Sequence, residues 1–350
     1  MTKSQISRRG FIGGVAVATA SVALTACSNE TSSSQSGSSS SSSSSSTASS
    51  PKTDFSETTG DKLKITTLSE NTNTGHERLS SEFGFSAHIQ LGDSTLIFDT
   101  AKKGDFIEHA QELNADIANC KTMVLSHAHY DHCGGVMKYY NSFGGNGRSI
   151  YLKDCFFDGA SEKYYDDISG TKLDFTDGKP GYFNIGISFT EEQLKATGVE
   201  IKYMTAQSQQ IAPGIKLHGN FVRNPLDPKM LIKNEKGQYI VDDFDEEVAI
   251  SIETSKGIVV VSGCSHTGIE NIVQAIKERE GKQVYAVIGG FHLLDATETQ
   301  IQNSIDTFSG LGVSHMGVSH CIGDKAKKMF CEQLPDIAFV NTTGSVFEMK

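Results

Sequence analysis

The order of buried strands and helices is the feature that most constrains how this chain can fold. Its C-terminal third contains three strand–helix units, with strands expected at 258–262, 284–288 and 313–319 and helices at 268–279, 297–311 and 323–333. The earlier part alternates as half-buried strands at 63–68 and 86–91, followed by apolar strands at 95–99 and 122–126. Strands early and strand–helix units late predict a layered α/β sandwich.

The first 27 residues are typical of an export signal rather than of a folded segment. A stretch similar to the twin-arginine signal is present as Ser7-Arg8-Arg9-Gly10-Phe11-Ile12, and a short apolar run covers 13–24. The run ends in Leu24-Thr25-Ala26-Cys27, which resembles a lipobox. We therefore predict a cleaved lipoprotein signal over 1–27, a lipid on Cys27, and a location on the extracytoplasmic face of the cell membrane. The alternative is a chance arginine pair ahead of an uncleaved anchor.

Serine dominates the segment that follows, because 15 of the 20 residues from Thr31 to Ser50 are serine. Such a tract buries no apolar surface, so we predict a disordered tether over 28–61. The catalytic domain is then expected over 62–350. Within it, the segment 139–190 is rich in aromatic residues and glycine. We interpret this segment as an insertion, which is either a lid near the site or a packed surface subdomain.

The formal net charge of −11 limits the partners of the chain. A chain this acidic repels phosphate backbones, so nucleic-acid binding is not expected. A small anionic substrate is still compatible with this negative net charge, because a metal cation in the site would make the local electric field attractive to an anion. No protein partner is evident from the sequence, and the expected partners are a small-molecule substrate and, through the N-terminal lipid, the membrane.

Four side chains able to bind metal lie within six residues, directly after the strand expected at 122–126. They are His127, His129, Asp131 and His132. Buried imidazoles and carboxylates need partners, so a tight loop of this composition is not explained by core packing. Imidazole and carboxylate ligands suit zinc, iron or manganese. The sequence therefore predicts a metal site at this loop.

Each of the three late strands is followed by a histidine. These histidines are His266, His292 and His320. Catalytic groups in α/β folds gather at the carboxyl ends of strands. By position alone, all three are therefore candidates for the site that holds the 127–132 loop.

The segment His127-Ala128-His129-Tyr130-Asp131-His132 resembles the signature of the metallo-β-lactamase superfamily. Further segments are similar to one subfamily, labelled dihydropterin-ribofuranosylaminobenzene-phosphate synthase-like: Glu82-Phe83-Gly84-Phe85-Ser86, Phe98-Asp99-Thr100, Gly263-Cys264-Ser265-His266-Thr267-Gly268-Ile269, Ile288-Gly289-Gly290-Phe291-His292-Leu293 and His320-Cys321-Ile322-Gly323. The resemblance covers about residues 63–349. It implies an αββα sandwich with one or two metal ions at its edge.

The resemblance also implies roles for the matching residues. The ligands of a first metal would be His127, His129 and His266, and those of a second would be Asp131, His132 and His320. Asp131 is in addition the expected catalytic residue, as the acceptor of a proton from the attacking water. Asp99 is expected to orient a ligand imidazole from behind.

Cys264 departs from the superfamily pattern, which places an aspartate between the two metals at this point. It is either a thiolate ligand or a spectator beside His266, and we favour His266 as the ligand. His292 is either a contact of metal or substrate or a structural histidine. Arg223 matches an arginine of the subfamily and would either bind an anion or lie on the surface as an ordinary solvated residue.

This set of residues favours a metal-dependent hydrolase, because a bound metal activates water without a Ser, Cys or Lys nucleophile. The expected cofactor is one or two divalent ions, zinc first and iron or manganese otherwise. The expected substrate is a small, anionic ester-type molecule, either a phosphoester or a lactone, since a helix starting at Gly323 favours an anion. The biosynthetic role in the subfamily label is not expected of an exported lipoprotein. Two alternatives stay open: a lipid-anchored metal- or ligand-binding protein without turnover, and a di-iron redox protein.

Overall fold

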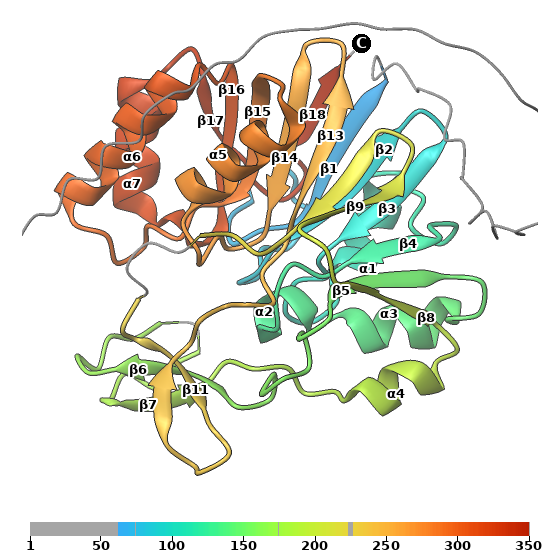
Figure 1. Ribbon diagram of the computed structural model, residues 1–350, viewed down its shortest axis with the longest axis vertical. Coiled ribbons are helices and arrows are strands. Elements are labelled where there is room, and N and C mark those ends of the chain that lie inside the picture. The colour runs from blue at the N-terminus through green and yellow to red at the C-terminus, as the bar shows by residue number, and fades with distance from the viewer. Residues whose placement is uncertain (1–61, 74, 174, 223–226, 350) are drawn as a thin grey trace, which may run out of the picture. The chain divides into compact units, whose positions relative to one another are not determined.

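The computed structural model describes residues 62–73, 75–173, 175–222 and 227–349 (Figure 1). The chain divides into two units, Met1–Thr53 and Asp54–Lys350, and every described residue belongs to the second. The export signal, Cys27, the tether and Arg223 lie outside the described residues, so their roles stay predictions. None of the described helices combines the length and the apolar character that a membrane span needs.

The first of two large sheets has seven strands in the order β18-β1-β2-β3-β4-β5-β8. The strands are β1 (Leu63–Ser69), β2 (Ser86–Leu91), β3 (Ser94–Phe98), β4 (Thr122–Val124), β5 (Ser149–Lys153), β8 (Glu200–Met204) and β18 (Val346–Met349). β18, β1, β2 and β3 pair antiparallel, whereas β3, β4, β5 and β8 pair parallel. The first and last strands of the described chain therefore lie side by side.

The second large sheet also has seven strands, in the order β17-β16-β15-β14-β13-β10-β9. The strands are β9 (Ser208–Ala212), β10 (Ile215–His218), β13 (Ala249–Thr254), β14 (Gly257–Ser262), β15 (Val284–Gly290), β16 (His315–Ser319) and β17 (Ala338–Val340). β14 to β17 pair parallel. Their carboxyl ends therefore lie at one edge of the sheet.

The two sheets pack face to face and carry helices on their outer faces, which makes the αββα sandwich that the sequence predicts (Figure 1). Apolar residues of both sheets, such as Ile65 and Val261, share the core between them. The outer helices of the first sheet are α1 (Phe106–Glu112), α3 (Val136–Phe143) and α4 (Glu191–Ala196), and those of the second are α5 (Ile269–Glu280), α6 (Glu298–Leu311) and α7 (Asp324–Gln333). The three predicted strand–helix units of the C-terminal third are present with small shifts of their ends.

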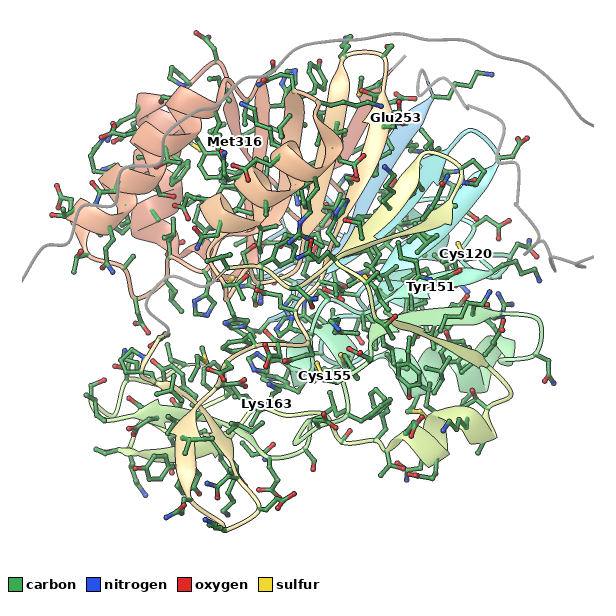
Figure 2. The ribbon with its side chains drawn as sticks, viewed as in Figure 1. Cys120, Tyr151, Cys155, Lys163, Glu253 and Met316 are labelled. Carbon is green, nitrogen blue, oxygen red and sulfur yellow. The ribbon has the colours of Figure 1, made fainter. Side chains whose placement is uncertain are left out.

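A smaller sheet stands beside the sandwich and has the order β12-β11-β6-β7. Its strands are β6 (Lys163–Asp167), β7 (Gly181–Asn184), β11 (Met230–Lys233) and β12 (Tyr239–Val241). The aromatic segment 139–190 is thus divided in the structure. Its first part forms most of α3 and all of β5. Tyr139 of α3 and Tyr151 of β5 lie in the sandwich cores, and only the later part of the segment enters the small sheet. Lys163 lies where the small sheet meets the sandwich (Figure 2).

Candidate metal centre

Four loops at one edge of the sandwich carry the predicted site residues. The loop after β4 holds His127 and His129 and continues into the short helix α2 (Tyr130–Cys133), which holds Asp131 and His132. The loops after β14, β15 and β16 bring in the later candidates, and the last of them is a 3-10 turn, η1 (His320–Ile322). Parallel pairing places the loops after β14, β15 and β16 at one edge of the second sheet, and the loop after β4 of the first sheet meets them there. Residues that are up to 193 positions apart in the sequence therefore meet in one place.

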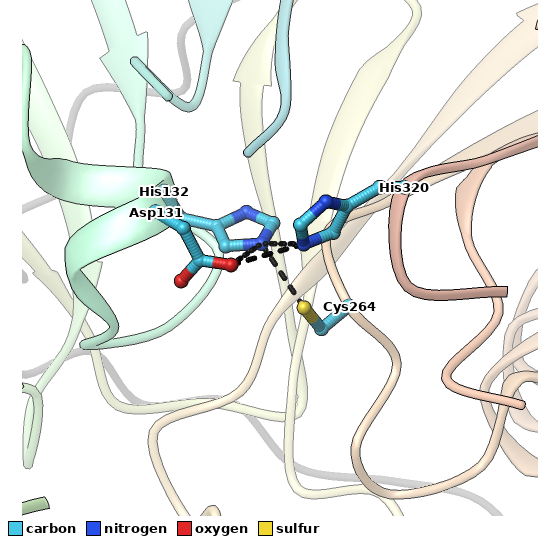
Figure 3. Close-up of side chains that lie close together, drawn as sticks. All are labelled: Asp131, His132, Cys264 and His320. Carbon is cyan, nitrogen blue, oxygen red and sulfur yellow. Dashed lines mark hydrogen bonds and ion pairs between the residues drawn. The ribbon is translucent and has the colours of Figure 1, made fainter. Parts of the chain in front are cut away.

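The first group of converging side chains is Asp131, His132, Cys264 and His320 (Figure 3). His132 Nε2 lies 3.2 Å from His320 Nε2 and 3.0 Å from Cys264 Sγ. Asp131 Oδ2 lies 3.0 Å from His320 Nε2. All four ligand atoms lie within 4.8 Å of one another, and all four side chains are buried. This spacing is what a single cation between them requires.

The second group is His127, Cys264 and His266, whose ligand atoms also lie within 4.8 Å of one another. His127 Nε2 and His266 Nε2 are 3.3 Å apart. The His129 ring lies 4.6 Å from that of His127 and 4.8 Å from that of His266, between ring centroids, but no His129 ligand atom joins the group. His129 therefore lies at the margin of this group, whereas the first-metal set implied by the resemblance makes it a full ligand.

Cys264 belongs to both groups, which gives it a more central place than the sequence-based preference for His266 suggested. Its sulfur lies where the superfamily pattern places an aspartate between two metals, and His266 lies in the second group beside it. Burial raises the pKa of the Cys264 thiol well above its ordinary value, and the adjacent Cys321 thiol raises it further. A bound cation reverses that preference, because a coordinating thiol is deprotonated by the metal.

Asp99 orients the first loop from behind, as expected. Its carboxylate accepts hydrogen bonds from the Ser126 backbone N–H and hydroxyl, both at 2.7 Å, and from His132 Nδ1–H at 2.6 Å. Since the Ser126 proton goes to Asp99, the Ser126 oxygen is left to accept from His127 Nδ1–H at 2.9 Å. Both Nε2 atoms are therefore turned toward the centre of the site.

Two buried glutamates that sequence reasoning did not single out hold the other loops. Glu70 accepts the His320 backbone N–H at 2.6 Å, and the neighbouring Asn71 accepts His320 Nδ1–H at 2.9 Å. Glu247 accepts the backbone N–H groups of His266 and Thr267 at 2.7 and 2.8 Å. No local motif marks these residues, because their partners are far away in the sequence.

The pKa shifts of the site residues differ in direction from one residue to the next. Burial lowers the pKa of His127 well below 6.5, with His132 adding to the effect, and burial does the same to His129 and His266. Burial alone would lower the pKa of His132, but the Asp99 and Asp131 carboxylates raise it. Burial alone would raise the pKa of the Asp131 carboxyl, but His132 and His320 hold it below the ordinary value. His127, His129 and His266 are therefore neutral, as metal binding needs, whereas a cation bound by His132 would have to displace the proton that Asp99 and Asp131 favour there.

Backbone strain is concentrated around this site. Five residues other than glycine have a positive φ here: Asp99 (58°), Phe244 (52°), Ser265 (67°), His292 (42°) and His320 (52°). Such conformations cost free energy and persist where the surroundings enforce them. At His320 the bond from its N–H to Glu70 provides that enforcement. Strain of this kind is typical of functional sites.

The residues present fit a divalent metal. The Nδ1 atoms of His127, His132 and His320 are each engaged by an acceptor, so their Nε2 atoms keep a lone pair for the centre. His266 Nδ1 is buried without a hydrogen-bond partner among the described residues. Imidazole, carboxylate and thiolate together form a donor set that Zn²⁺ accepts readily.

His292 lies beside the two groups without joining either. Its ring centroid is 4.2 Å from that of His266, the side chain is half-buried, and it lines the pocket above the centre. Phe244, which sequence reasoning missed, stacks flat against His266, with centroids 4.0 Å apart. Lys163 lies over the Phe244 ring and forms buried ion pairs with Asp242 and Glu246, which connect the small sheet to the site.

A pocket opens over the ligand groups and encloses about 470 Å³, its solvent-facing mouth included. Its floor consists of ligand-bearing residues, among them Asp131, His266 and His320. Its sides are mainly apolar and come from the small sheet and the adjoining loops: Phe83, Tyr130, Tyr165, Leu173, Phe175, Ile185 and Met230. We call this second set the aromatic wall. The floor and the wall together define where a substrate would lie.

The fold and this arrangement of ligands define a class of protein, and sequence comparison agrees with it. The family model described as the metallo-beta-lactamase superfamily matches residues 82–201. The chain belongs to the metallo-beta-lactamase superfamily, in the subfamily that the sequence motifs indicated.

Within that superfamily, the chain is 30 % identical over 290 residues to a 7,8-dihydropterin-6-methyl-4-(beta-D-ribofuranosyl)-aminobenzene-5'-phosphate synthase of Methanocaldococcus jannaschii, covering 79 % of this chain and 93 % of the relative. It is 28 % identical over 257 residues to an uncharacterized protein of the same organism, covering 73 % and 89 %. Among solved structures it is similar to Tm1679, described as a metal-dependent hydrolase of the beta-lactamase superfamily. The TM-score is 0.67 and the identity 25 %, with 82 % of this chain and 98 % of that chain covered.

Proposed function

We propose that this protein is a metal-dependent hydrolase of small ester-type molecules, using one or two divalent cations, with Zn²⁺ as the expected metal. The observation that carries the proposal is the convergence of two ligand groups that share Cys264 beneath an open pocket. One cation would be held by Asp131, His132, His320 and Cys264. The other would be held by His127, His266 and Cys264, with His129 at its margin.

A divalent cation bound there supplies Lewis acidity and lowers the pKa of water to near 7. The side chains of the floor provide the rest. Asp131 lines the pocket and stays ionised, so its carboxylate can orient the attacking water and accept its proton. His292 faces the same pocket and is placed to contact the substrate. No Ser, Cys or Lys nucleophile is needed.

Phosphoesters and lactones are the two substrate classes that we propose for this site. The lining of the pocket favours the lactone or another neutral ester, because none of the described residues that line it is Lys or Arg. In the sequence, the helix start at Gly323 is a reason to expect an anionic substrate. In the structure, Leu294 packs directly against Gly323, so an apolar side chain lies beside this helix start. The synthase activity in the name of the M. jannaschii relative belongs to that protein, and transfer of a group to an acceptor other than water is the competing outcome of the test.

The export signal and the lipid on Cys27 belong to this proposal as well. A lipobox cysteine behind a twin-arginine-like stretch would place the enzyme on the extracytoplasmic face of the membrane. Globomycin-sensitive processing and labelling of Cys27 with a radioactive fatty acid test this part. A Cys27→Ser chain that is still labelled would contradict it.

The catalytic proposal is tested by metal analysis of the purified chain together with hydrolysis of a chromogenic phosphodiester and of lactones. We expect His127→Ala and His320→Ala to lose bound metal and to lower the rate by about 100-fold or more. His315→Ala is the matched control, because His315 lies at the opposite end of β16 from His320 and pairs with Tyr285 instead. It should keep both metal and rate.

The other readings predict different results. Bound metal without hydrolysis of any ester would indicate a binding protein without turnover. Bound iron that cycles between oxidation states would indicate a di-iron redox protein. A rate that is unchanged in His127→Ala and His320→Ala would overturn the site assignment itself.

A further inference from the structure

We propose that the aromatic wall is a binding subsite for a neutral, flat aromatic ring fused or attached to the ester that is cleaved. This inference rests on the proposed function and names the substrate class for the same pocket. The wall is formed by residues outside the ligand groups, and none of them was a candidate from the sequence. Three observations carry the proposal: the ring geometry, the charges at the rim, and the way the wall is fixed.

The rings of the wall form a continuous cluster that begins at a ligand histidine. Phe83 lies edge-on to His320, with centroids 5.0 Å apart, and Phe175 lies 5.8 Å from Phe83. Tyr165 continues the series at 5.2 Å from Phe175, nearly perpendicular to it. Tyr130 completes the cluster, 6.2 Å from Phe175. Edge-to-face arrangements of this kind are favourable for aromatic rings, and an aromatic ligand can extend them.

The charges around the wall disfavour an anionic substrate group at this position. Asp295 lines the pocket at the wall, whereas Asp131 lines the floor as a proposed ligand of the cation. Two lysines lie against rings of the wall, Lys102 over Tyr130 and Lys229 over Tyr165, and neither is free. Lys229 Nζ is engaged by Asp295 Oδ2 at 2.9 Å and by the Tyr165 hydroxyl at 3.3 Å. A phosphate lying against the wall would therefore meet ring faces, the Asp295 carboxylate and lysines that are already engaged.

The same rim contacts fix the wall in place. The Tyr165 hydroxyl donates to Asp295 Oδ2 at 3.1 Å, which joins β6 of the small sheet to the loop after β15. Burial, with Asp295 adding, raises the pKa of Tyr165 to about 12, so the phenol keeps the proton that it donates. Beneath it, Met230 and Ile185 pack with Tyr165 in one apolar cluster. The wall is therefore preformed, and a ligand need not order it.

The test compares ligands that differ only by a fused benzene ring. Dihydrocoumarin is the benzo-fused form of δ-valerolactone, and 2-tetralone and cyclohexanone are their carbocyclic analogues, which no hydrolase can open. Calorimetric titration of the full-length purified chain should give a dissociation constant for 2-tetralone about tenfold or more below that for cyclohexanone. Equal dissociation constants for the two ketones would overturn the proposal without any variant.

Variants then assign the selectivity to the wall. Phe175→Leu keeps an apolar side chain but removes the ring, and it should reduce the tenfold ratio to about threefold or less. Phe157→Leu is the matched control, because Phe157 is half-buried in the same 139–190 segment and packs with Phe189 away from the pocket. A ratio that Phe175→Leu leaves unchanged, or that Phe157→Leu lowers equally, would contradict the assignment.

Lactone hydrolysis by the same proteins separates this inference from the proposed function. If both hold, Phe175→Leu lowers kcat/KM for dihydrocoumarin relative to δ-valerolactone by the same factor as the binding ratio, mainly through KM. If neither lactone is opened while 2-tetralone still binds selectively, lactone hydrolysis fails and the subsite stands. If both lactones are opened with a ratio that Phe175→Leu does not change, the hydrolase stands and the subsite fails.

Discussion

The floor and the wall face the same pocket, but they are held in place by different kinds of interaction. The floor depends on hydrogen bonds that three buried carboxylates, Asp99, Glu70 and Glu247, accept from ligand-bearing loops, and each carboxylate thereby fixes one loop. The wall depends on apolar contacts among rings, with one polar trio at its rim. A hydrogen-bonded floor needs particular atoms, whereas a packed wall needs only apolar volume of suitable shape.

This difference implies that chemistry and selectivity are encoded separately. A substitution behind the floor should damage metal binding, because the acceptor that it removes fixes a ligand imidazole, as Asp99 does, or the backbone of a ligand-bearing loop, as Glu70 and Glu247 do. A substitution in the wall should change which substrate binds and leave the metal in place. Four predictions test or refine this contrast.

The largest expected effect is that acid destabilises the sandwich that carries the floor. His88 is buried in β2 with both ring nitrogens unpartnered among the described residues, and burial lowers its pKa to about 4. Above pH 6.5 this side chain is neutral whether the chain is folded or not. As the pH falls from about 6.5 to about 4, the unfolded chain takes up the proton first, so folding is disfavoured. The loss should reach about 3 kcal/mol per such histidine.

Urea unfolding between pH 4 and 7, with a chelator present, measures this effect. His88→Leu should remove about 3 kcal/mol of the difference in unfolding free energy between pH 4 and pH 7. His218, whose pKa burial lowers to about 3, should behave in the same way. His315→Leu is a control with a smaller expected change, since His315 is only partly buried. An equal pH dependence in His88→Leu and the parent would refute the prediction.

Asp99→Asn should lower metal affinity by about 10- to 100-fold. The amide retains the shape of the carboxylate but offers one acceptor oxygen for the three donors that Asp99 now serves. Competition with a chromophoric zinc chelator gives the affinity. Asp295→Asn at the rim is the matched substitution and should leave the affinity within about twofold. If both variants lose affinity equally, floor and wall are not separate.

Glu247→Gln should destabilise the folded chain by about 1–2 kcal/mol, because one of its hydrogen-bond donors from the His266–Thr267 turn loses its acceptor in a buried place. The free energy of unfolding in urea measures the change. Glu253→Gln on β13 is the control, since Glu253 is exposed (Figure 2) and pairs with Lys282 at the surface. Destabilisation of the two variants to the same degree would show that Glu247 has no special structural role.

Lys229→Met should have the smallest effect, below about 1 kcal/mol in stability, because its ion pair with Asp295 lies at the solvent-facing rim. Metal content should stay unchanged. The Met variant should bind an anionic aromatic ester no more weakly than the parent, because Lys229 is already engaged by Asp295. A large loss of affinity for anionic esters alone would instead make Lys229 a substrate contact and weaken the case for a neutral ring.

The sequence located the floor well, because its signals are local. His127, His129, Asp131 and His132 lie within six residues, and a histidine at a strand end can be recognised without knowing its partner. The carboxylates behind them could not be found in this way. Glu70 and Glu247 are two of 42 acidic residues, and Glu70 acts on a residue 250 positions away.

The wall escaped prediction for a related reason. The small sheet pairs β6 and β7 with β11 and β12, which are separated by more than 40 residues. The wall therefore forms only when segments far apart in the sequence come together, and no local pattern shows which segments those are. Aromatic richness over 139–190 pointed to this region, but it did not distinguish the residues of the small sheet from Tyr139 and Tyr151, which belong to the sandwich cores.

The hydrogen bond between Glu70 and His320 joins residues that are synthesised far apart in time, which limits when the metal centre can form. Glu70 follows the first strand of the domain, and its backbone N–H is in turn bound by Thr343, just before the last strand. A chain emerging from the ribosome would present the 127–132 loop long before His320 is synthesised. The Asp131–His132 group can therefore be completed only after His320 has been synthesised, so a cation held by the whole group would report that the chain has been made at least to this residue.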